Sequence, residues 1–166
     1  MLRAIIFALA LLCIGSVRAD ELQEARRFHK AGDYAEALQR VNKFLVEHPK
    51  DAQARFLKAM TLTELKQRAE AIAVYTAITE DFPELPEPYN NLAVLYAAAG
   101  DYEKARGLLE QAIHNDPKYA IAYENLGDVY AKLALMAYEK SAELEKSATS
   151  ARLKSNALKG LIGAKP

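Results

Sequence analysis

The stretch YNNLAVLYAAAGDYEKARGLLEQAIHNDP, residues 89–117, decides the fold, because its residue types recur at a fixed spacing along the chain. Its last residue, Pro117, follows Pro83 and Pro49 at intervals of 34 residues. A period of about 20–50 residues is typical of stacked repeat arrays. Three more columns keep the same interval: Ala37, Ala71 and Ala105; Ala25, Ala59, Ala93 and Gly127; and Phe28, Leu62, Tyr96 and Tyr130.

The order of residues within each period resembles the tetratricopeptide repeat (TPR) family, whose repeat runs W-x2-L-G-x2-Y, then A-x3-F, then P. The resemblance covers about residues 20–140. The first two copies fit loosely, and Glu21 and Glu24 stand at large apolar positions of the first. The later copies fit better, with Tyr89-x2-Leu92-Ala93-x2-Tyr96, Ala105-x3-Leu109 and Pro117 in the third and Tyr123-x2-Leu126-Gly127-x2-Tyr130 in the fourth.

The resemblance implies an all-α fold, a right-handed superhelical α-solenoid of about 3.5 helix-turn-helix repeats with a C-terminal capping helix. The array is expected over residues 20–146, and the capping helix and tail over 147–166. The repeats are expected at about 18–51, 52–85, 86–119 and 120–146. The expected helices are 20–31, 34–47, 51–64, 68–81, 86–99, 102–115 and a long one from 119.

The repeated columns have physical reasons. The small residues let the two helices of a repeat approach closely, and the large residues fill the space between them. We interpret Tyr89, Tyr96, Tyr123 and Tyr130 as packing residues of this kind. Gly-Asp pairs at 32–33 and 100–101 predict turns, because Gly takes the left-handed helix-ending conformation and Asp caps the next helix.

The fourth repeat departs from the pattern. No Gly-Asp turn follows Tyr130, and residues 131–145 contain no helix breaker. Either the turn is shortened near Leu133–Leu135 or one long helix runs through, and the shortened turn is favoured. The tail, 147–163, has an amphipathic stripe, which predicts a capping helix and leaves a partner-binding or membrane-surface helix as alternatives.

Residues 1–19 have the composition of a secretory signal peptide. Arg3 supplies the positive charge, residues 4–15 form an apolar run, and Val17-Arg18-Ala19 fits a cleavage site. We expect cleavage after Ala19 and export to the periplasm of a Gram-negative bacterium, or secretion. Lipid attachment at Cys13 is not favoured, because Leu rather than a small residue precedes it.

The charge balance narrows the classes of partner. The chain has 166 residues, with 22 basic and 22 acidic side chains. Its length suits one domain. The absence of a basic excess argues against nucleic acid as a partner.

The resemblance also implies a binding groove, because the first helix of each TPR repeat lines a concave surface. Asn91 and Asn125 stand one repeat apart and are expected to stack, and an amide both donates to and accepts from a peptide backbone. Alternatively, Asn is simply common at this position, and Phe56 and Met60 pack between repeats. The predicted groove residues are Arg26, Phe56, Met60, Asn90, Asn91, Val94, Glu124, Asn125 and Asp128, with Leu22 and His29 beside them.

The groove departs from that of TPR relatives that bind chaperone tails. Those relatives hold a terminal carboxylate with Lys and Arg side chains. Here Arg26 remains, but Glu124 and Asp128 occupy the later positions. The sequence therefore predicts a basic or neutral peptide rather than an acidic C-terminus.

No catalytic or metal-binding motif stands out. His29, His48 and His114 lack the spacing of metal ligands, and the chain has no GxSxG, P-loop or dinucleotide-binding glycine pattern. We therefore predict a non-enzymatic scaffold without metal, cofactor or small-molecule substrate. It would bind a peptide or protein during cell-envelope or secretion-complex assembly, as a monomer or weak homo-oligomer. The alternatives are a structural self-associating oligomer and a lipid-anchored subunit of an outer-membrane complex.

Overall fold

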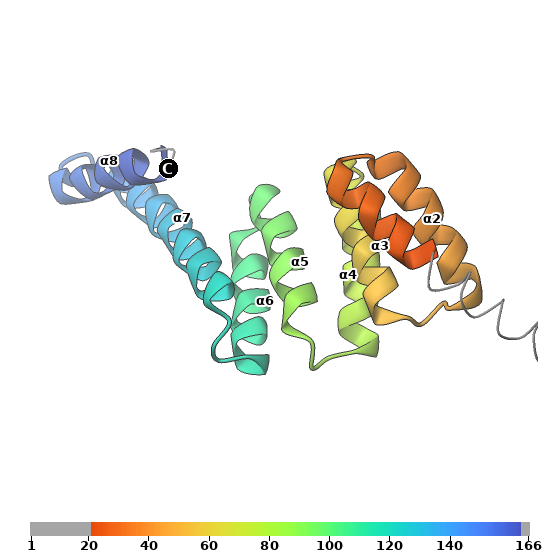
Figure 1. Cartoon of the computed structure of the whole chain (residues 1–166). Helices are drawn as coiled ribbons and strands as arrows, with labels where there is room; N and C mark the ends of the chain where they lie inside the picture. Colours follow the sequence, from red (N-terminus) through yellow and green to blue (C-terminus); the bar gives the residue numbers. More distant parts are fainter. Residues whose placement is uncertain (1–20, 164–166) are drawn as a thin grey trace, which may run out of the picture. The chain divides into compact units, whose positions relative to one another are not determined.

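The computed structural model describes residues 21–163, and every regular element in that range is a helix, as predicted. Within each half of the chain, residues 21–83 and 84–163, short turns join consecutive helices, which pack side by side (Figure 1). The predicted helix bounds agree with the observed ones within one or two residues up to residue 115. The elements are a first helix (residues 21–31), α2 (Tyr34–Glu47), α3 (Ala52–Glu64), α4 (Arg68–Asp81), α5 (Pro86–Ala98), α6 (Tyr102–Asn115), α7 (Ala120–Leu144) and α8 (Thr149–Gly163).

The chain divides into two compact units, which are described separately. Unit 1 ends at Pro83 and contains the first helix and α2–α4. In it, α2 packs on α3 and α3 packs on α4. Its core includes Ala25, Val41 and Leu57, and its largest fully buried side chain is Tyr75, which is 1% exposed.

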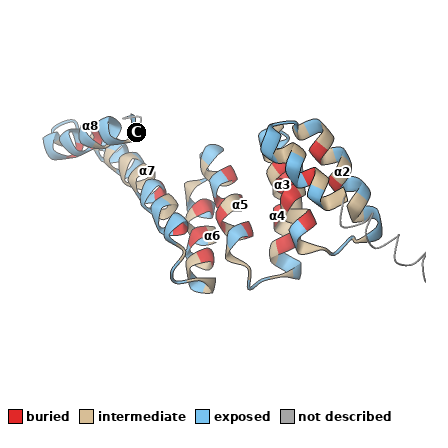
Figure 2. Cartoon of the chain, in the orientation of Figure 1, coloured by how far each residue is buried: buried red, intermediate tan, exposed pale blue. Residues whose placement is uncertain are grey.

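Unit 2 begins at Glu84 and contains α5–α8. Helix α5 packs on α6, α6 on α7 and α7 on α8. Figure 2 shows the buried positions concentrated on the facing sides of these helices. The core cluster of the unit is Ala93, Ala105, Leu109, Ala112, Ala122 and Val129.

The small residues of the repeat occupy the positions that the sequence predicted. Ala25, Ala59 and Ala93 on the first helices are fully buried. Ala37, Ala71 and Ala105 on the second helices are fully buried as well. Because a methyl group fills each contact, the two helices of a repeat come close enough for their larger neighbours to interlock.

The predicted turns are confirmed, and the turn that lacks glycine keeps the same geometry. Gly32 and Gly100 have φ angles of 81° and 85°, and Lys66 takes the equivalent place with φ 62°. In each turn the following residue donates to a carbonyl five positions earlier, which closes the helix end. Asp33 and Asp101 then accept a bond from the backbone of the next helix.

The shortened turn favoured near Leu133–Leu135 is wrong, because α7 continues through that region as one helix to Leu144. Residues 131–144 are mostly Ala, Leu, Lys and Glu, which have high helix propensity, and none is Gly or Pro. Nothing in this segment supplies the left-handed residue that ends the earlier helices. The second helix of the fourth repeat is therefore displaced towards the C-terminus.

Helix α8 packs against the C-terminal half of α7. Lys159 Nζ lies 2.7 Å from Glu139 Oε1, and the Lys154 ammonium lies 5.2 Å from the centre of the Tyr138 ring. Ala151 on α8 is buried against this helix. Helix α8 thus covers the part of α7 that extends beyond an ordinary repeat. It does not cover the first part of α7.

The tyrosines of the fourth repeat do not pack as predicted. Tyr89 and Tyr96 of the third repeat are partly buried against the core of unit 2. Tyr123 and Tyr130, their counterparts 34 residues later, remain 51% and 48% exposed. The reason is that, among residues 21–163, no second helix of the fourth repeat lies over the first half of α7.

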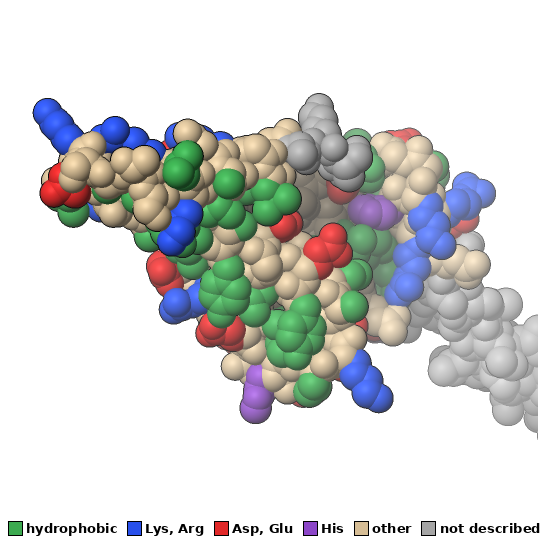
Figure 3. Space-filling view, turned by 90° about the vertical axis from the view of Figure 1, so that its left-hand side faces the viewer, with side chains coloured by type: hydrophobic (Ala, Val, Ile, Leu, Met, Phe, Trp, Pro, Cys, Tyr) green, Lys and Arg blue, Asp and Glu red, His purple; other side chains and the backbone are tan. Residues whose placement is uncertain are grey.

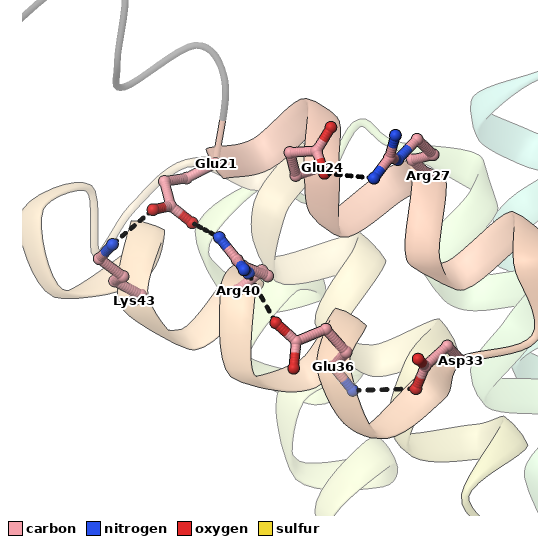
Figure 4. A network of polar contacts seen from close by, with 7 residues as sticks. All are labelled: Glu21, Glu24, Arg27, Asp33, Glu36, Arg40 and Lys43. Atoms are coloured by element: carbon pink, nitrogen blue, oxygen red, sulfur yellow. Dashed lines mark hydrogen bonds and ion pairs between the residues drawn. The ribbon is translucent and has the colours of Figure 1, made fainter.

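An ionic network joins the first helix to α2 (Figure 4). Glu21 forms ion pairs with Lys43 and with Arg40, the second at 3.3 Å. Arg40 also contacts Glu36 at 2.8 Å. The hydrogen bond from Lys43, assisted by Arg40, lowers the pKa of the Glu21 carboxyl. The charged form of Glu21 therefore stabilises the docking of the first helix.

Replacing Glu21 with Gln is expected to lower the stability of unit 1 slightly at neutral pH. A carboxyl whose pKa is lowered by folding contributes stability above its ordinary value of 4.5, and that contribution disappears as the pH falls through the folded value. Wild type and variant should therefore converge in acid, and also at high salt. Thermal unfolding between pH 3 and pH 7 measures the difference.

The matched control is Glu24→Gln. Glu24 pairs with Arg27 on the same helix, at 2.9 Å, and so links no second element. It should change stability less than Glu21→Gln does. A Glu21→Gln deficit that stays constant from pH 7 to pH 3 would contradict the ionic explanation.

The expected signal peptide and its cleavage after Ala19 lie outside the described residues. The C-terminal Ala164-Lys165-Pro166 lies outside them too. Among the helices between residues 21 and 163, none combines the length and the apolar character needed to cross a membrane.

Candidate functional site

Unit 2 contains an open hollow of about 430 Å³. Its floor is apolar and comes from the small side chains of α5 together with Leu109 and Val129. Small residues at these positions let α6 and α7 pack against α5, and they leave a depression where no large side chain projects. The lining residues are Ala93, Val94, Ala97, Ala98, Tyr102, Leu109, Asn125, Asp128, Val129 and Lys132.

The polar rim of the hollow comes from α7. Asn125, Asp128 and Lys132 are spaced three and four residues apart, which places them on one face of the helix. An amide, a carboxylate and an ammonium group therefore border one apolar floor. Because the two charges have opposite signs, the rim has no net charge.

The predicted asparagines form a connected set, with Asn90 between the other two. Asn125 Nδ2 donates to Asn90 Oδ1 at 2.8 Å, and Asn90 Nδ2 donates to Asn91 Oδ1 at 3.2 Å. Asn90 is 4% exposed, so it is a buried link between α5 and α7. One of the four hydrogen-bonding positions of the Asn125 amide is used in this bond. Asn90 thus orients Asn125 at the edge of the hollow.

Three of the predicted groove residues lie in the lining of this hollow: Val94, Asn125 and Asp128. Val94 is 45% exposed, an unusual position for a large apolar side chain within α5. Glu124 is exposed outside the lining, and Asn91 is half-buried next to Asn90. Of the residues predicted on α7, Asn125 and Asp128 therefore line the hollow, whereas Glu124 lies on another side of the helix.

The predicted groove residues of unit 1 are engaged in contacts within that unit. Arg26 donates to Gln53 at 2.7 Å. Phe56 meets the Tyr75 ring edge to face, with centroids 5.6 Å apart. Met60 is half-buried on α3. Phe56 therefore has a packing contact, in line with the alternative in which it packs rather than binds a partner.

His29 of the first helix has a structural partner. Its Nδ1 lies 3.0 Å from Thr61 Oγ1, and Thr61 is fully buried. The Thr61 hydroxyl also donates to the Leu57 carbonyl at 2.7 Å. These bonds fasten the first helix to α3.

Lys132 and the alanines of the floor were not among the predicted groove residues. The repeat spacing contains the signal for Lys132, because it follows Ala98 by 34 residues just as Asp128 follows Val94. Extending the predicted surface by one helical turn would have included both. Tyr102 and Leu109 had no such signal, since they belong to the packing columns of the second helix.

The arrangement is suited to holding a side chain and a stretch of backbone. An apolar floor of this size accommodates a short aliphatic group, and the amide of Asn125 offers directional hydrogen bonds at its edge. Over the residues that the structure describes, no cluster of three or more potential metal ligands occurs.

Known proteins share this fold and part of this sequence. The TPR repeat-containing protein YvcD of Bacillus subtilis is 34% identical over 94 residues, which are 52% of this chain and 18% of YvcD. The chain spans 18% to 35% of the length of the curated relatives it matches. A solved structure of YrrB, described as a TPR protein with an unusual peptide-binding site, is 26% identical with a TM-score of 0.60, and the match covers 63% of this chain and 54% of YrrB.

A second solved structure supports the fold at lower identity. The first TPR domain of Spaghetti (RPAP3), bound to the HSP90 peptide SRMEEVD, is 19% identical with a TM-score of 0.66. That match covers 70% of this chain and 93% of the other. The family model described as Psidin, N-terminal TPR repeats region, matches residues 28–146, which is most of the chain. The chain therefore belongs to the TPR repeat family, in the group described as the Psidin N-terminal TPR repeats region.

Proposed function

We propose that the protein binds a peptide segment of a partner protein in the hollow of unit 2 and acts as a non-enzymatic scaffold. The observation that carries the proposal is the exposed apolar floor around Val94, bordered by the oriented amide of Asn125. Two structurally similar TPR proteins support it: the RPAP3 domain was solved with an HSP90 peptide, and YrrB is described as having an unusual peptide-binding site.

The charges of the hollow favour a peptide without net negative charge. The RPAP3 domain holds the peptide SRMEEVD, which is acidic. Here Asp128 balances Lys132 at the rim, and Glu124 adds negative charge on the same helix. A peptide with one aliphatic side chain for the floor and neutral or basic neighbours would meet these groups best.

A peptide-library selection tests the proposal. The full chain would be used to enrich random peptides, and enriched peptides would be titrated against wild type and Val94→Asp. A carboxylate on the apolar floor is expected to weaken binding by at least about tenfold, which corresponds to roughly 1.4 kcal/mol. Fluorescence anisotropy of a labelled peptide measures the change.

The matched control is Val46→Asp. Val46 is also an exposed valine on a helix, at 81%, and it lies in unit 1 outside the hollow. This control should bind like wild type. Equal peptide binding by Val94→Asp and Val46→Asp would mean that the hollow is not the peptide-binding site. Asn125→Ala is a poorer test, because it takes a hydrogen-bond partner from buried Asn90 and so also changes stability.

We further propose that the protein is exported and works in the cell envelope. The support is the pattern of residues 1–19, a charged start, an apolar run and a small residue at Ala19. Expression of the full chain in a Gram-negative host, with intact mass of the periplasmic fraction, tests this proposal. A mass that starts at Asp20 is expected, and a cytoplasmic product that keeps residues 1–19 would overturn it.

A further inference from the structure

The first half of α7 carries the packing face of a repeat without the helix that normally covers it. Ala25, Ala59 and Ala93 mark this face in the earlier repeats and are fully buried. Gly127 continues the column, yet it is exposed, and a Cβ placed on it would meet no atom within 4 Å. The face is therefore open.

The open face extends along the whole helix as a regular stripe. Its positions advance in alternating steps of four and three residues, which is the spacing of a coiled-coil seam. All of them are exposed except Ala134, which is half-buried, and Leu144 is 74% exposed. In Figure 3, hydrophobic side chains gather on the surface that α7 and α8 form. The stripe consists of Tyr123, Gly127, Tyr130, Ala134, Ala137, Ser141 and Leu144.

We propose that this stripe pairs with the same stripe of a second copy, with the two α7 helices antiparallel about a two-fold axis near Ala134. In that register Tyr130 lies opposite Ala137 of the second copy, and Gly127 lies opposite Ser141 of the second copy. Large side chains thus meet small ones on both sides of the axis, and the small residues at the centre allow close approach. Each copy completes the fourth repeat of the other.

Charge complementarity identifies a second copy as the occupant. The antiparallel pairing brings Glu124, next to the stripe near the start of α7, level with the end of α7 and the start of α8 in the other copy. The end of α7 and the turn after it carry Glu143 and Glu145 beside Lys146. Helix α8 carries Arg152, Lys154 and Lys159 and contains no acidic residue, so this region as a whole has a net positive charge. By the two-fold symmetry this attraction occurs twice. A symmetric interface of this kind closes at a dimer.

The area of the stripe sets the strength of the dimer. Two half-exposed tyrosines, one leucine and four small residues offer on the order of 500 Å² per copy, so the interface would bury about 1,000 Å² in total. This is at the lower limit of specific interfaces. The dimer is therefore expected to dissociate in about the micromolar range.

The dimer leaves the peptide hollow open. Asn125 and Lys132 are about 200° and 180° around α7 from Tyr123, on the opposite side of the helix. Each copy would thus present its own hollow. The inference does not depend on the proposed function, but a dimer would give such a scaffold two binding sites and the avidity that follows.

Sedimentation velocity of the full chain over a range of concentrations tests the dimer. Ala137→Glu places a charge on the stripe and is expected to weaken dimerisation at least about tenfold, because it faces the Tyr130 ring of the second copy. Met136→Glu is the matched control on the opposite side of α7, and Met136 is 52% exposed. It should dimerise like wild type. A monomer at every concentration, or equal loss in both variants, would overturn the proposal.

Cysteine cross-linking tests the direction of pairing. The natural Cys13 is replaced by Ser, and Tyr123→Cys and Leu144→Cys are made in separate chains. Antiparallel helices predict disulfides in the mixture, between one chain of each kind. Cross-linking of Tyr123→Cys chains with each other, or no cross-linking, would contradict this geometry.

Discussion

Replacing Tyr75 with Ala is expected to lower the free energy of unfolding of unit 1 by about 3–5 kcal/mol. Tyr75 on α4 is the largest fully buried side chain of the described residues, at 1% exposure, and its ring contacts Phe56 of α3. Truncation removes the apolar contacts and leaves a cavity that the neighbouring helices cannot fill. Urea unfolding followed by circular dichroism measures the loss.

The informative comparison is Tyr130→Ala, which removes a tyrosine from another position of the repeat. Tyr130 is 48% exposed, and its hydroxyl lies 3.3 Å from Glu110. Its truncation should cost less than about 1 kcal/mol when measured on dilute, monomeric protein. A loss as large as that of Tyr75→Ala would mean that a helix covers this face of α7 in solution.

The second large effect is expected from Ala59→Phe. Ala59 is fully buried where α3 meets its partner helix, so a phenyl ring there must push the helices apart. Overpacking of this kind costs about 1–3 kcal/mol or more. We expect a matching fall in melting temperature, measured by calorimetry on the full chain.

The same substitution at Gly127 is the matched control, since Gly127 holds the equivalent position in the fourth repeat. A side chain there meets open space, and Phe favours the helix over Gly by a few tenths of a kcal/mol, because Gly is about 0.5–1 kcal/mol worse than Ala and Phe lies between the two. Gly127→Phe is therefore expected to leave stability unchanged or raise it slightly. A destabilisation equal to that of Ala59→Phe would contradict the open fourth repeat.

Local sequence signals were sufficient for the fold of the first three repeats. Asp33 and Asp101 cap helices, Gly32 and Gly100 end them, and each effect depends on a few neighbouring residues. Lys66 shows that the array can impose the same turn without glycine.

The fourth repeat could not be predicted in the same way. The run Tyr123-x2-Leu126-Gly127-x2-Tyr130 is the same whether or not a second helix covers it. Its state depends on where the chain turns back, and the helix-forming residues after Ala131 postpone that turn to residues 145–148. The exposure of these tyrosines therefore depends on where the next helix packs, and residues 123–130 contain no signal for that position.

The candidate site was predictable where it follows the repeat register. Val94, Asn125 and Asp128 were identified from their positions on first helices, and the structure brings them to one hollow. The burial of Asn90 could not be seen from spacing alone, because it depends on how closely α5 and α7 approach. Lys132 could have been predicted in the same way, by extending the predicted surface one helical turn beyond Asp128.

In the proposed function, the hollow of unit 2 holds the peptide. Nuclear magnetic resonance titration with a library-selected peptide tests it most directly, by following the backbone amides and the Asn125 side-chain amide. We predict that the largest shifts cluster at residues 93–98 and 125–132, the two segments that supply most of the lining. Shifts confined to unit 1, or to the stripe around Tyr130 and Ala137, would contradict the account.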